Sequence, residues 1–337
     1  MNTTPCPDCQ GGTPFTRREF IKSTVTTVAA AAAMPLAFPA SAATKPAKKA
    51  ASETLVTTFY KSLTEPQRKV VCFPFNHELR SKVDNNWHIT DKKLGEFFTK
   101  DQQAMVKEIF LGLHSPEYAD KVYKQVEHDG GSAGGFNGTS VALFGEPGTG
   151  KFEFVITGRH CTRRCDGDSV EGAAFGGPIF YGHAAQGFNE KPDHPGNAYW
   201  YQARRANEVW NSLNGKQRDV ALLGDSRDEK GTATVKLSGL KTGLPGIPMA
   251  ELARDQKELV RKVLADLLAP FRKADTDEAM KLIERNGFDH LHMAFYKNED
   301  VGKDGVWDVW QIEGPAMVWY FRGDPHVHVW ANVKAKA

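Results

Sequence analysis

The sequence has almost no excess charge and no long apolar run. Its 337 residues include 43 Lys and Arg and 41 Asp and Glu, which gives a formal net charge of +2. A charge this small produces no field that would attract nucleic acid or an anionic membrane. The apolar stretch at 23–38 is shorter than the about 20 residues that span a bilayer. We therefore predict neither a nucleic-acid partner nor a stable membrane span.

Cysteine is also scarce, with five residues in the chain. Cys6 and Cys9 precede the predicted processing site described below, which leaves Cys72, Cys161 and Cys165 in the mature protein. An odd number allows at most one internal disulfide, and Cys161 could pair with Cys165 only if the chain turns sharply between them. Cys161 is otherwise interpreted as a buried inert thiol or as a soft metal ligand.

The N-terminus has the features of a twin-arginine signal peptide. Arg17-Arg18 precedes Lys22, the weakly apolar stretch 23–38 follows, and Ala40-Ser41-Ala42 offers small residues for cleavage. We predict that residues 1–42 direct a folded precursor to the twin-arginine translocase and are then removed. The mature protein would be periplasmic or extracellular, with a retained N-terminal anchor as the alternative. Export of a folded chain also suggests that folding or cofactor loading finishes in the cytoplasm.

The remaining chain is predicted to contain a short tether and one repeated domain. Residues 43–52, rich in Lys, Ala and Pro, are predicted to form the flexible tether, and residues 53–337 a single globular domain. Its halves, about 53–205 and 206–337, share short strings about 150 residues apart, although chance similarity between amphipathic helices is the alternative. The matched strings are Leu63-Thr64 with Gln67-Arg68 against Leu213-Asn214 with Gln217-Arg218, Asp101-Gln102 against Asp255-Gln256, and Ile156-Thr157-Gly158 against Ile312-Glu313-Gly314.

Each half is predicted to begin with helices and to end with strands. An N-cap residue precedes Gln67 and Gln217 by three positions, as in a capping box, and apolar residues at helical spacing follow Gln102 and Gln256. We predict an α+β fold, an internally duplicated unit of amphipathic helices with a mostly antiparallel β-sheet. The aromatic and β-branched runs predicted as strands are 141–144, 152–157, 179–182, 291–296, 306–312, 317–321 and 326–333.

Residues 145–151, GEPGTGK, match the glycine and lysine spacing of a phosphate-binding loop. Phe152, however, stands where a Ser or Thr hydroxyl would hold magnesium. We therefore interpret this segment as a hairpin loop between two predicted strands.

Four histidines are candidate metal ligands. Alternate side chains on a strand share a face, so His326 and His328 can offer two imidazoles to one ion. His160 and His183 each lie at a predicted strand end and are candidates to complete the shell. Neutral imidazole binds zinc, copper, iron or nickel. We predict a transition-metal site, for zinc, copper or iron, with these four ligands.

Charged side chains in the same motifs are candidates for catalysis. Glu313 could act as a general base or a fifth ligand, and Arg159 or Arg322 could hold an anionic substrate. His290 and His292 form a second His-x-His pair in more apolar surroundings and are weaker candidates. The alternative for the pair near the C-terminus is hydrogen bonding in a polar cleft without a metal.

Four segments together resemble an exported bacterial family described as a domain of unknown function, DUF3500. They are Gly158-Arg159-His160, 177–183, 312–315 and 325–328. The likeness covers nearly all of the mature chain, although other members carry paired histidines where this chain has Arg159-His160. The resemblance implies export and a single repeated unit, and it implies no particular activity.

Two functional hypotheses follow. The first is an exported metal-binding protein and candidate metalloenzyme, hydrolytic with zinc or oxidative with copper or iron. The second is a non-catalytic ligand-binding protein with a cleft lined by arginines and by an aromatic cluster near the C-terminus. A purely structural role predicts that the candidate ligands lie far apart. The aromatic cluster consists of Trp307, Trp310, Trp319 and Trp330.

Overall fold

The computed structural model describes residues 51–183, 198–297, 308–323 and 326–337. The predicted signal peptide and all but the last residues of the predicted tether lie outside this part of the chain. Trp307 also lies outside it. No helix within the described ranges is long and apolar enough to cross a membrane.

The first half of the described chain places helices before strands. A short strand, β1, follows the first two helices, and the other strands follow the remaining helices. The elements are α2 (Ser52–Ser62), α3 (Glu65–Val71), β1 (Cys72–Phe73), α4 (Leu94–Phe97), α5 (Lys100–Gly112), α6 (Ala119–Gly130), β2 (Ser140–Gly145), β3 (Phe152–Gly158), β4 (Cys161–Cys165) and β5 (Ile179–His183).

The second half follows nearly the same order. The predicted boundary between residues 205 and 206 falls inside its first helix, α7. The elements are α7 (Trp200–Ser212), α8 (Gly215–Ala221), β6 (Leu222–Leu223), β7 (Ile247–Pro248), α9 (Arg254–Leu268), α10 (Lys273–Asn286), β8 (His292–Tyr296), β9 (Val309–Gly314), β10 (Met317–Arg322) and β11 (Val327–Val333).

The duplication extends to individual side-chain hydrogen bonds. Gln67 begins α3 through a capping box with Thr64, and its amide exchanges hydrogen bonds of 2.9 and 3.1 Å with the amide of Gln102. In the second half Gln217 and Gln256 repeat this exchange at 2.9 Å in both directions. A reciprocal amide pair is a specific arrangement, because donors and acceptors must match on both sides. The predicted duplicated α+β fold is confirmed.

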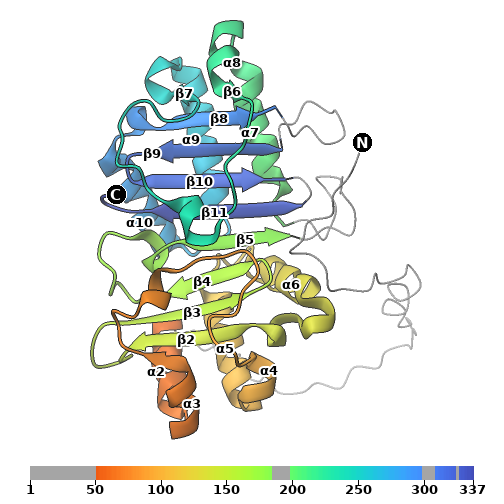
Figure 1. Ribbon diagram of the computed structural model, residues 1–337, viewed down its shortest axis with the longest axis vertical. Coiled ribbons are helices and arrows are strands. Elements are labelled where there is room, and N and C mark those ends of the chain that lie inside the picture. Colours follow the sequence, from red (N-terminus) through yellow and green to blue (C-terminus); the bar gives the residue numbers. More distant parts are fainter. Residues whose placement is uncertain (1–50, 184–197, 298–307, 324–325) are drawn as a thin grey trace, which may run out of the picture. The chain divides into compact units, whose positions relative to one another are not determined.

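The strands form one mixed, mostly antiparallel sheet (Figure 1). Its order is β1-β2-β3-β4-β5-β11-β10-β9-β8-β6, with β7 beside β8. The parallel pairs are β1 with β2 and β6 with β8, which are equivalent positions at the two edges. The two halves join where β5 pairs antiparallel with β11.

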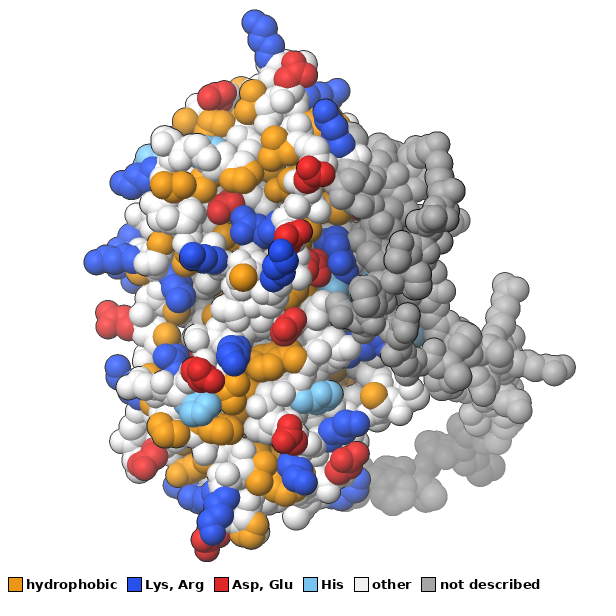
Figure 2. Space-filling view, in the orientation of Figure 1, with side chains coloured by type: hydrophobic (Ala, Val, Ile, Leu, Met, Phe, Trp, Pro, Cys, Tyr) orange, Lys and Arg blue, Asp and Glu red, His pale blue; other side chains and the backbone are white. Residues whose placement is uncertain are grey.

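Both faces of the sheet are covered. Helices such as α5, α7 and α9 lie behind the sheet in the view of Figure 1, where the main core forms, and loop segments cross its front. On the loop face Val83 and Val235 pack with Phe180 and Trp330 in a second core cluster. Coverage of both faces explains why the strands are almost entirely buried rather than alternately exposed. On the molecular face shown in Figure 2, charges of both signs are interspersed.

The GEPGTGK segment forms the loop of an antiparallel hairpin, as predicted. β2 and β3 pair from Gly145 with Phe152 to Ser140 with Thr157. No helix follows the loop, so the phosphate-binding geometry is absent from this hairpin.

Strand β4 was not predicted, and it separates the two cysteines that were considered for a disulfide. Cys161 and Cys165 are its first and last residues, so an extended chain places them about 13 Å apart, beyond the about 7 Å that a disulfide can bridge. Both are free and buried, and burial raises the pKa of the Cys161 thiol to about 11. Cys161 is therefore a buried, protonated thiol.

The repeated amide pairs allow a matched test of burial. Gln67→Ala should lower the free energy of unfolding by about 1–3 kcal/mol, because it leaves the buried Gln102 amide without its partner. Gln217→Ala should have a smaller effect, less than about 1 kcal/mol, because its hydrogen bonds are more exposed to water. Urea denaturation of both variants checks this, and an equal loss in both would contradict it.

Candidate metal centre

A row of residues across three strands brings the candidate ligands together. His328 on β11 lies opposite Gly182 on β5, and Tyr181 lies opposite Cys161, the first residue of β4. His160, one position before Cys161, therefore continues the row beside Gly182. A Cβ atom on Gly182 would collide with the Val327 carbonyl oxygen and come within 3.4 Å of Cγ of His160. The absence of a side chain at Gly182 leaves room for the imidazoles.

His160 occupies a strained turn. Gly158 pairs with Cys161 across the β3–β4 hairpin, so Arg159 and His160 form a two-residue loop. His160 has a φ of +53°, and its N–H donates to the Asn85 carbonyl at 2.9 Å. A left-handed conformation costs a non-glycine residue about 1–3 kcal/mol and is concentrated at functional sites. The turn directs this imidazole towards β11.

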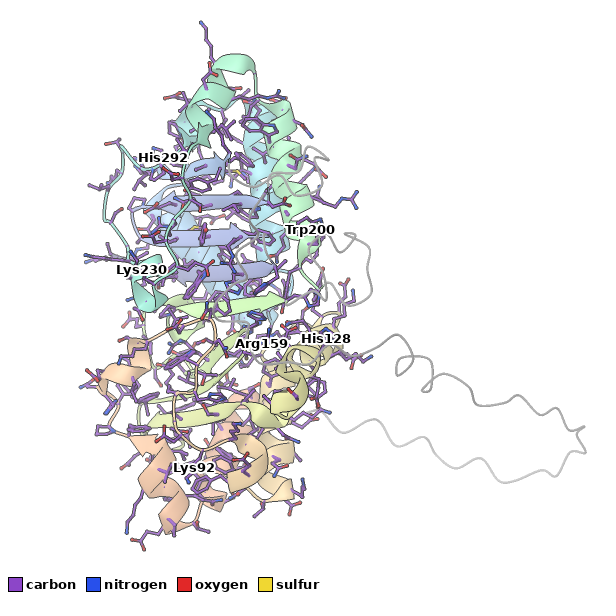
Figure 3. All side chains as sticks on the ribbon, turned by 45° about the vertical axis from the view of Figure 1, so that its right-hand side comes forward. Lys92, His128, Arg159, Trp200, Lys230 and His292 are labelled. Carbon is purple, nitrogen blue, oxygen red and sulfur yellow. The ribbon has the colours of Figure 1, made fainter. Side chains whose placement is uncertain are left out.

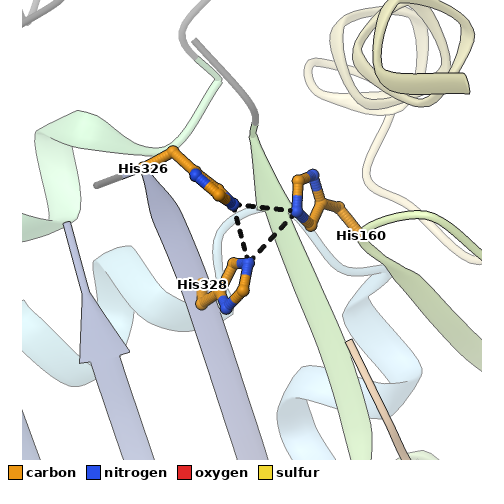
Figure 4. Close-up of side chains that lie close together, drawn as sticks. All are labelled: His160, His326 and His328. Atoms are coloured by element: carbon orange, nitrogen blue, oxygen red, sulfur yellow. Dashed lines mark hydrogen bonds between the residues drawn. The ribbon is translucent and has the colours of Figure 1, made fainter. Parts of the chain in front are cut away.

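The three imidazoles meet at one point. Figure 4 shows His328, on β11, and His326, which immediately precedes this strand, facing His160 across β5. The Nε2 atom of His160 lies 3.1 Å from that of His326 and 3.1 Å from that of His328. The Nε2 atoms of His326 and His328 are 2.9 Å apart. Three ligand atoms of one kind therefore surround a common centre.

These separations suit a metal ion. With metal–nitrogen bonds of about 2.0–2.1 Å, two ligand nitrogens lie about 2.9 Å apart at a right angle and about 3.3 Å apart in a tetrahedron. The observed 2.9–3.1 Å falls within this range. His160, His326 and His328 would supply three of the four ligands of a tetrahedral site. The three histidines could hold a metal ion.

Hydrogen bonding alone cannot satisfy the cluster. An imidazole nitrogen has one in-plane site, which carries either a proton or a lone pair. Among three mutually adjacent Nε2 atoms, a single N–H can face two lone pairs, but those two lone pairs then face each other at about 3 Å. Any other distribution of protons leaves at least one unfavourable pair as well. A shared cation would remove all of these repulsions.

Asp129, near the end of α6, orients the first imidazole. Its Oδ2 atom lies 2.8 Å from Nδ1 of His160, and Gln125 one turn earlier donates to the same oxygen. A carboxylate only accepts, so the His160 proton lies on Nδ1 and the Nε2 lone pair faces the centre. Metal-binding histidines commonly donate their other ring nitrogen to a carboxylate in this way.

Glu229 takes the same role for His328. Its Oε2 atom lies 2.6 Å from Nδ1 of His328, and its Oε1 atom lies 3.3 Å from Nε of Arg322. Arg322 Nη2 also lies 2.7 Å from the same ring nitrogen, and it can donate there only if that nitrogen carries no proton. The tautomer that donates to Glu229 exposes the Nε2 lone pair and is the one that can bind a metal.

The environment keeps the imidazoles neutral. Loss of hydration on burial is the largest cause that lowers the pKa of each of the three. Neighbouring His160 and Arg322 act in the same direction on His326, whose pKa falls to about 2. Asp129 opposes the shift at His160, and the pKa of His328 lies well below its usual range. Neutral imidazole is the form that binds metal.

His183, the fourth predicted ligand, lies next to the cluster but is not part of it. It ends β5 opposite Val327, and its Nδ1 atom lies 3.7 Å from Oδ1 of Asp129. The group of residues that could hold one ion contains His160, His326 and His328. His183 thus shares a carboxylate with one of the three histidines.

The predicted role of Glu313 as a base or fifth ligand is wrong. On β9, Val309 is level with Arg322 and His328, whereas Glu313 lies four residues along the strand, about 13 Å away, and two strands from β11. Its Oε2 atom pairs with Nη2 of Arg227 at 2.6 Å. Glu313 stabilises a different part of the loop-covered face.

The prediction that an aromatic cluster lines a cleft is also wrong for the three tryptophans that the structure describes. Trp310, Trp319 and Trp330 are 0 % exposed and belong to the core clusters. They therefore line no cleft. Arg159, predicted to bind an anionic substrate and labelled in Figure 3, immediately precedes His160 in the turn between β3 and β4.

Sequence reasoning missed the two carboxylates. Asp129 had a detectable signal, because it lies three and seven residues after Val126 and Val122 on the buried face of an amphipathic helix. A buried aspartate at an apolar position needs a partner. Glu229 lies in a charged loop between β6 and the next helical turn, where nothing in the sequence distinguishes it from a solvated residue.

The family model described as "Protein of unknown function (DUF3500)" matches residues 45–331. Comparisons with curated proteins and with solved structures found no match.

The lowered pKa of His326 predicts a pH-dependent stability in metal-free protein. Below about pH 6.5 the unfolded chain protonates this imidazole and the folded chain does not, so stability falls as the pH decreases. The free energy of unfolding of His326→Gln should fall less steeply with decreasing pH than that of the wild type, by up to about 1.4 kcal/mol per pH unit between about pH 4 and 6.5. Above about pH 6.5 the two proteins should have the same pH dependence. Denaturant titrations at several pH values measure this, and identical slopes would contradict it.

Proposed function

This chain belongs to the DUF3500 family, and we propose that it binds one transition-metal ion through Nε2 of His160, His326 and His328. The observation that carries the proposal is the convergence of three buried Nε2 atoms within 3.1 Å of one another. Asp129 and Glu229 support it, because each accepts from the far nitrogen of a ligand.

The ligand set suits zinc, copper or iron, which accept neutral imidazole. Three ligands on one side leave coordination positions for water or a substrate, as in catalytic zinc sites. We infer a metalloenzyme from this open geometry. Zinc would support hydrolysis by a bound water, and copper or iron would support oxidative chemistry.

The proposal includes the location of the protein. The twin-arginine motif at Arg17-Arg18, the apolar stretch and the small residues before Ala43 support export as a folded precursor. The mature protein would then act in the periplasm or outside the cell, after contact with the twin-arginine translocase.

Metal analysis of untagged protein tests the binding site. The wild type should contain about one transition-metal ion per chain, and each of His160→Ala, His326→Ala and His328→Ala should lose it. The double variant His290→Ala/His292→Ala is the matched control, since it removes a second His-x-His pair at the start of β8, three strands away from β11 in the sheet. Wild-type protein that takes up no zinc, copper or iron would contradict the proposal.

Replacement of a supporting carboxylate tests the geometry around the ligands. Asp129→Asn should weaken metal affinity by about 10–100-fold, because it replaces the charged acceptor that orients the His160 ring with a neutral, weaker one. Asp120→Asn is the control, as Asp120 lies on the same helix and pairs with Lys124 at the surface. Competition with a chromogenic chelator measures both affinities. Equal affinities would exclude a supporting role for Asp129.

Replacement of the arginine pair tests export. Arg17→Lys with Arg18→Lys should leave the protein in the cytoplasm as an uncleaved precursor, whereas the unaltered chain should be found processed outside the membrane. Cell fractionation with mass spectrometry of the N-terminus distinguishes the two. Normal processing of the double variant would rule out the twin-arginine route.

A further inference from the structure

Arg159 is a charged side chain without a partner beside the three histidines. Within the described ranges its guanidinium makes no hydrogen bond or ion pair, and its Nε atom is shielded from solvent with no acceptor. A shielded N–H that lacks an acceptor is unfavourable, so it needs an explanation. Such a donor next to a candidate metal centre is the arrangement expected of a ligand-binding residue.

The guanidinium is within electrostatic range of the centre. Its charge acts on each of the three imidazoles and favours their neutral forms. Arg322, the other cation near the cluster, already forms an ion pair with Glu229 at 3.3 Å. Among the described residues, Arg159 is therefore the one of these two cations that has no ionic partner.

The charges around the cluster point to an anion. Among the described residues that pair with the imidazoles or lie beside them, Asp129 and Glu229 contribute two negative charges and Arg159 and Arg322 two positive charges, and a metal-bound imidazole is neutral. These charges sum to zero, so a divalent ion would leave this buried site with an excess of two positive charges. An uncompensated buried charge is costly. An anionic ligand at the open coordination position would offset part of it.

From this arrangement, and resting on the proposed metal site, we propose that the open position takes an oxyanion, a carboxylate or phosphate group of the substrate. One oxygen of the group would bind the ion, and a second would accept from the guanidinium of Arg159. A guanidinium presents its N–H groups as a planar fork that matches two oxygens of such a group. Arg159 thereby selects substrates with an acidic group and positions them against the metal.

Cobalt substitution separates this inference from metal binding itself. Co²⁺ accepts the same ligands and reports on its coordination through its visible absorption. Acetate and inorganic phosphate, titrated separately into cobalt-loaded protein, should change the spectrum in a saturable manner for at least one of the two. Arg159→Gln should retain cobalt and weaken the anion response by about tenfold or more, because a charge-assisted hydrogen bond is lost.

Two further variants sharpen the comparison. Arg159→Lys keeps the charge and loses the fork, so its affinity should fall between those of the wild type and Arg159→Gln. Arg254→Gln removes an exposed arginine at the start of α9 and should behave as the wild type. An equal anion affinity in Arg159→Gln and the wild type would overturn the role of Arg159.

The outcomes for the two proposals differ. If the wild type binds cobalt at the three histidines but its spectrum responds to neither anion, the oxyanion inference is overturned and the metal site stands. Failure of the wild type to bind cobalt at His160, His326 and His328 overturns the metal site and the inference with it.

Discussion

The pairing of β5 with β11 sets the position of every ligand. It joins the strands of the two halves, and its register places His328 opposite Gly182. A slip of one residue would turn His328 to the helix-covered face of the sheet and bring Val327 or Val329 to the centre. Because His160 comes from the first half and the other two histidines from the second, a bound ion would link the halves across this pair of strands.

Within the described residues, the duplicated scaffold carries the three-histidine cluster at one position. The hairpin of Gly158 with Cys161 recurs as Gly314 with Met317, so Ala316 stands at the position equivalent to His160. The 154-residue spacing that relates Gln102 to Gln256 also relates Asp129 to Ile283, which is buried in α10. The second copy thus has apolar side chains where the first has a candidate ligand and its supporting carboxylate. The repeat provides the frame, and side-chain differences between the copies provide the site.

The parts of the structure that depend on local periodicity could be predicted from the sequence. Helical spacing after Gln102 and Gln256 predicted α5 and α9, and the period of two in β11 put His326 and His328 on one face. Strand β4 was missed because Arg163 and Arg164 gave it a polar sequence. Both arginines are buried, Arg163 on the Phe180 carbonyl and Arg164 on Glu153, and such long-range partners are invisible to a window of neighbouring residues.

The predictions that failed were those about which distant segments of the chain lie together. Glu313 lies in a motif as distinctive as those of the histidines, but the motif does not indicate which end of a strand faces which neighbour. Asp129 could have been found from its position on a buried helix face, yet its partner could not, because 31 residues separate it from His160. Register and strand order supply this information, and both are properties of the whole sheet.

The same distance in sequence couples metal binding to folding. His160 and His326 are 166 residues apart, so in an unfolded chain their meeting carries a large loop-closure cost, and only the local pair His326 and His328 is available. Ion affinity should therefore appear with the β5–β11 pairing rather than before it. Under the proposed export of a folded precursor, that pairing forms in the cytoplasm. The metal would then be chosen from the cytoplasmic supply, and the buried position of the ligands would limit its exchange after export.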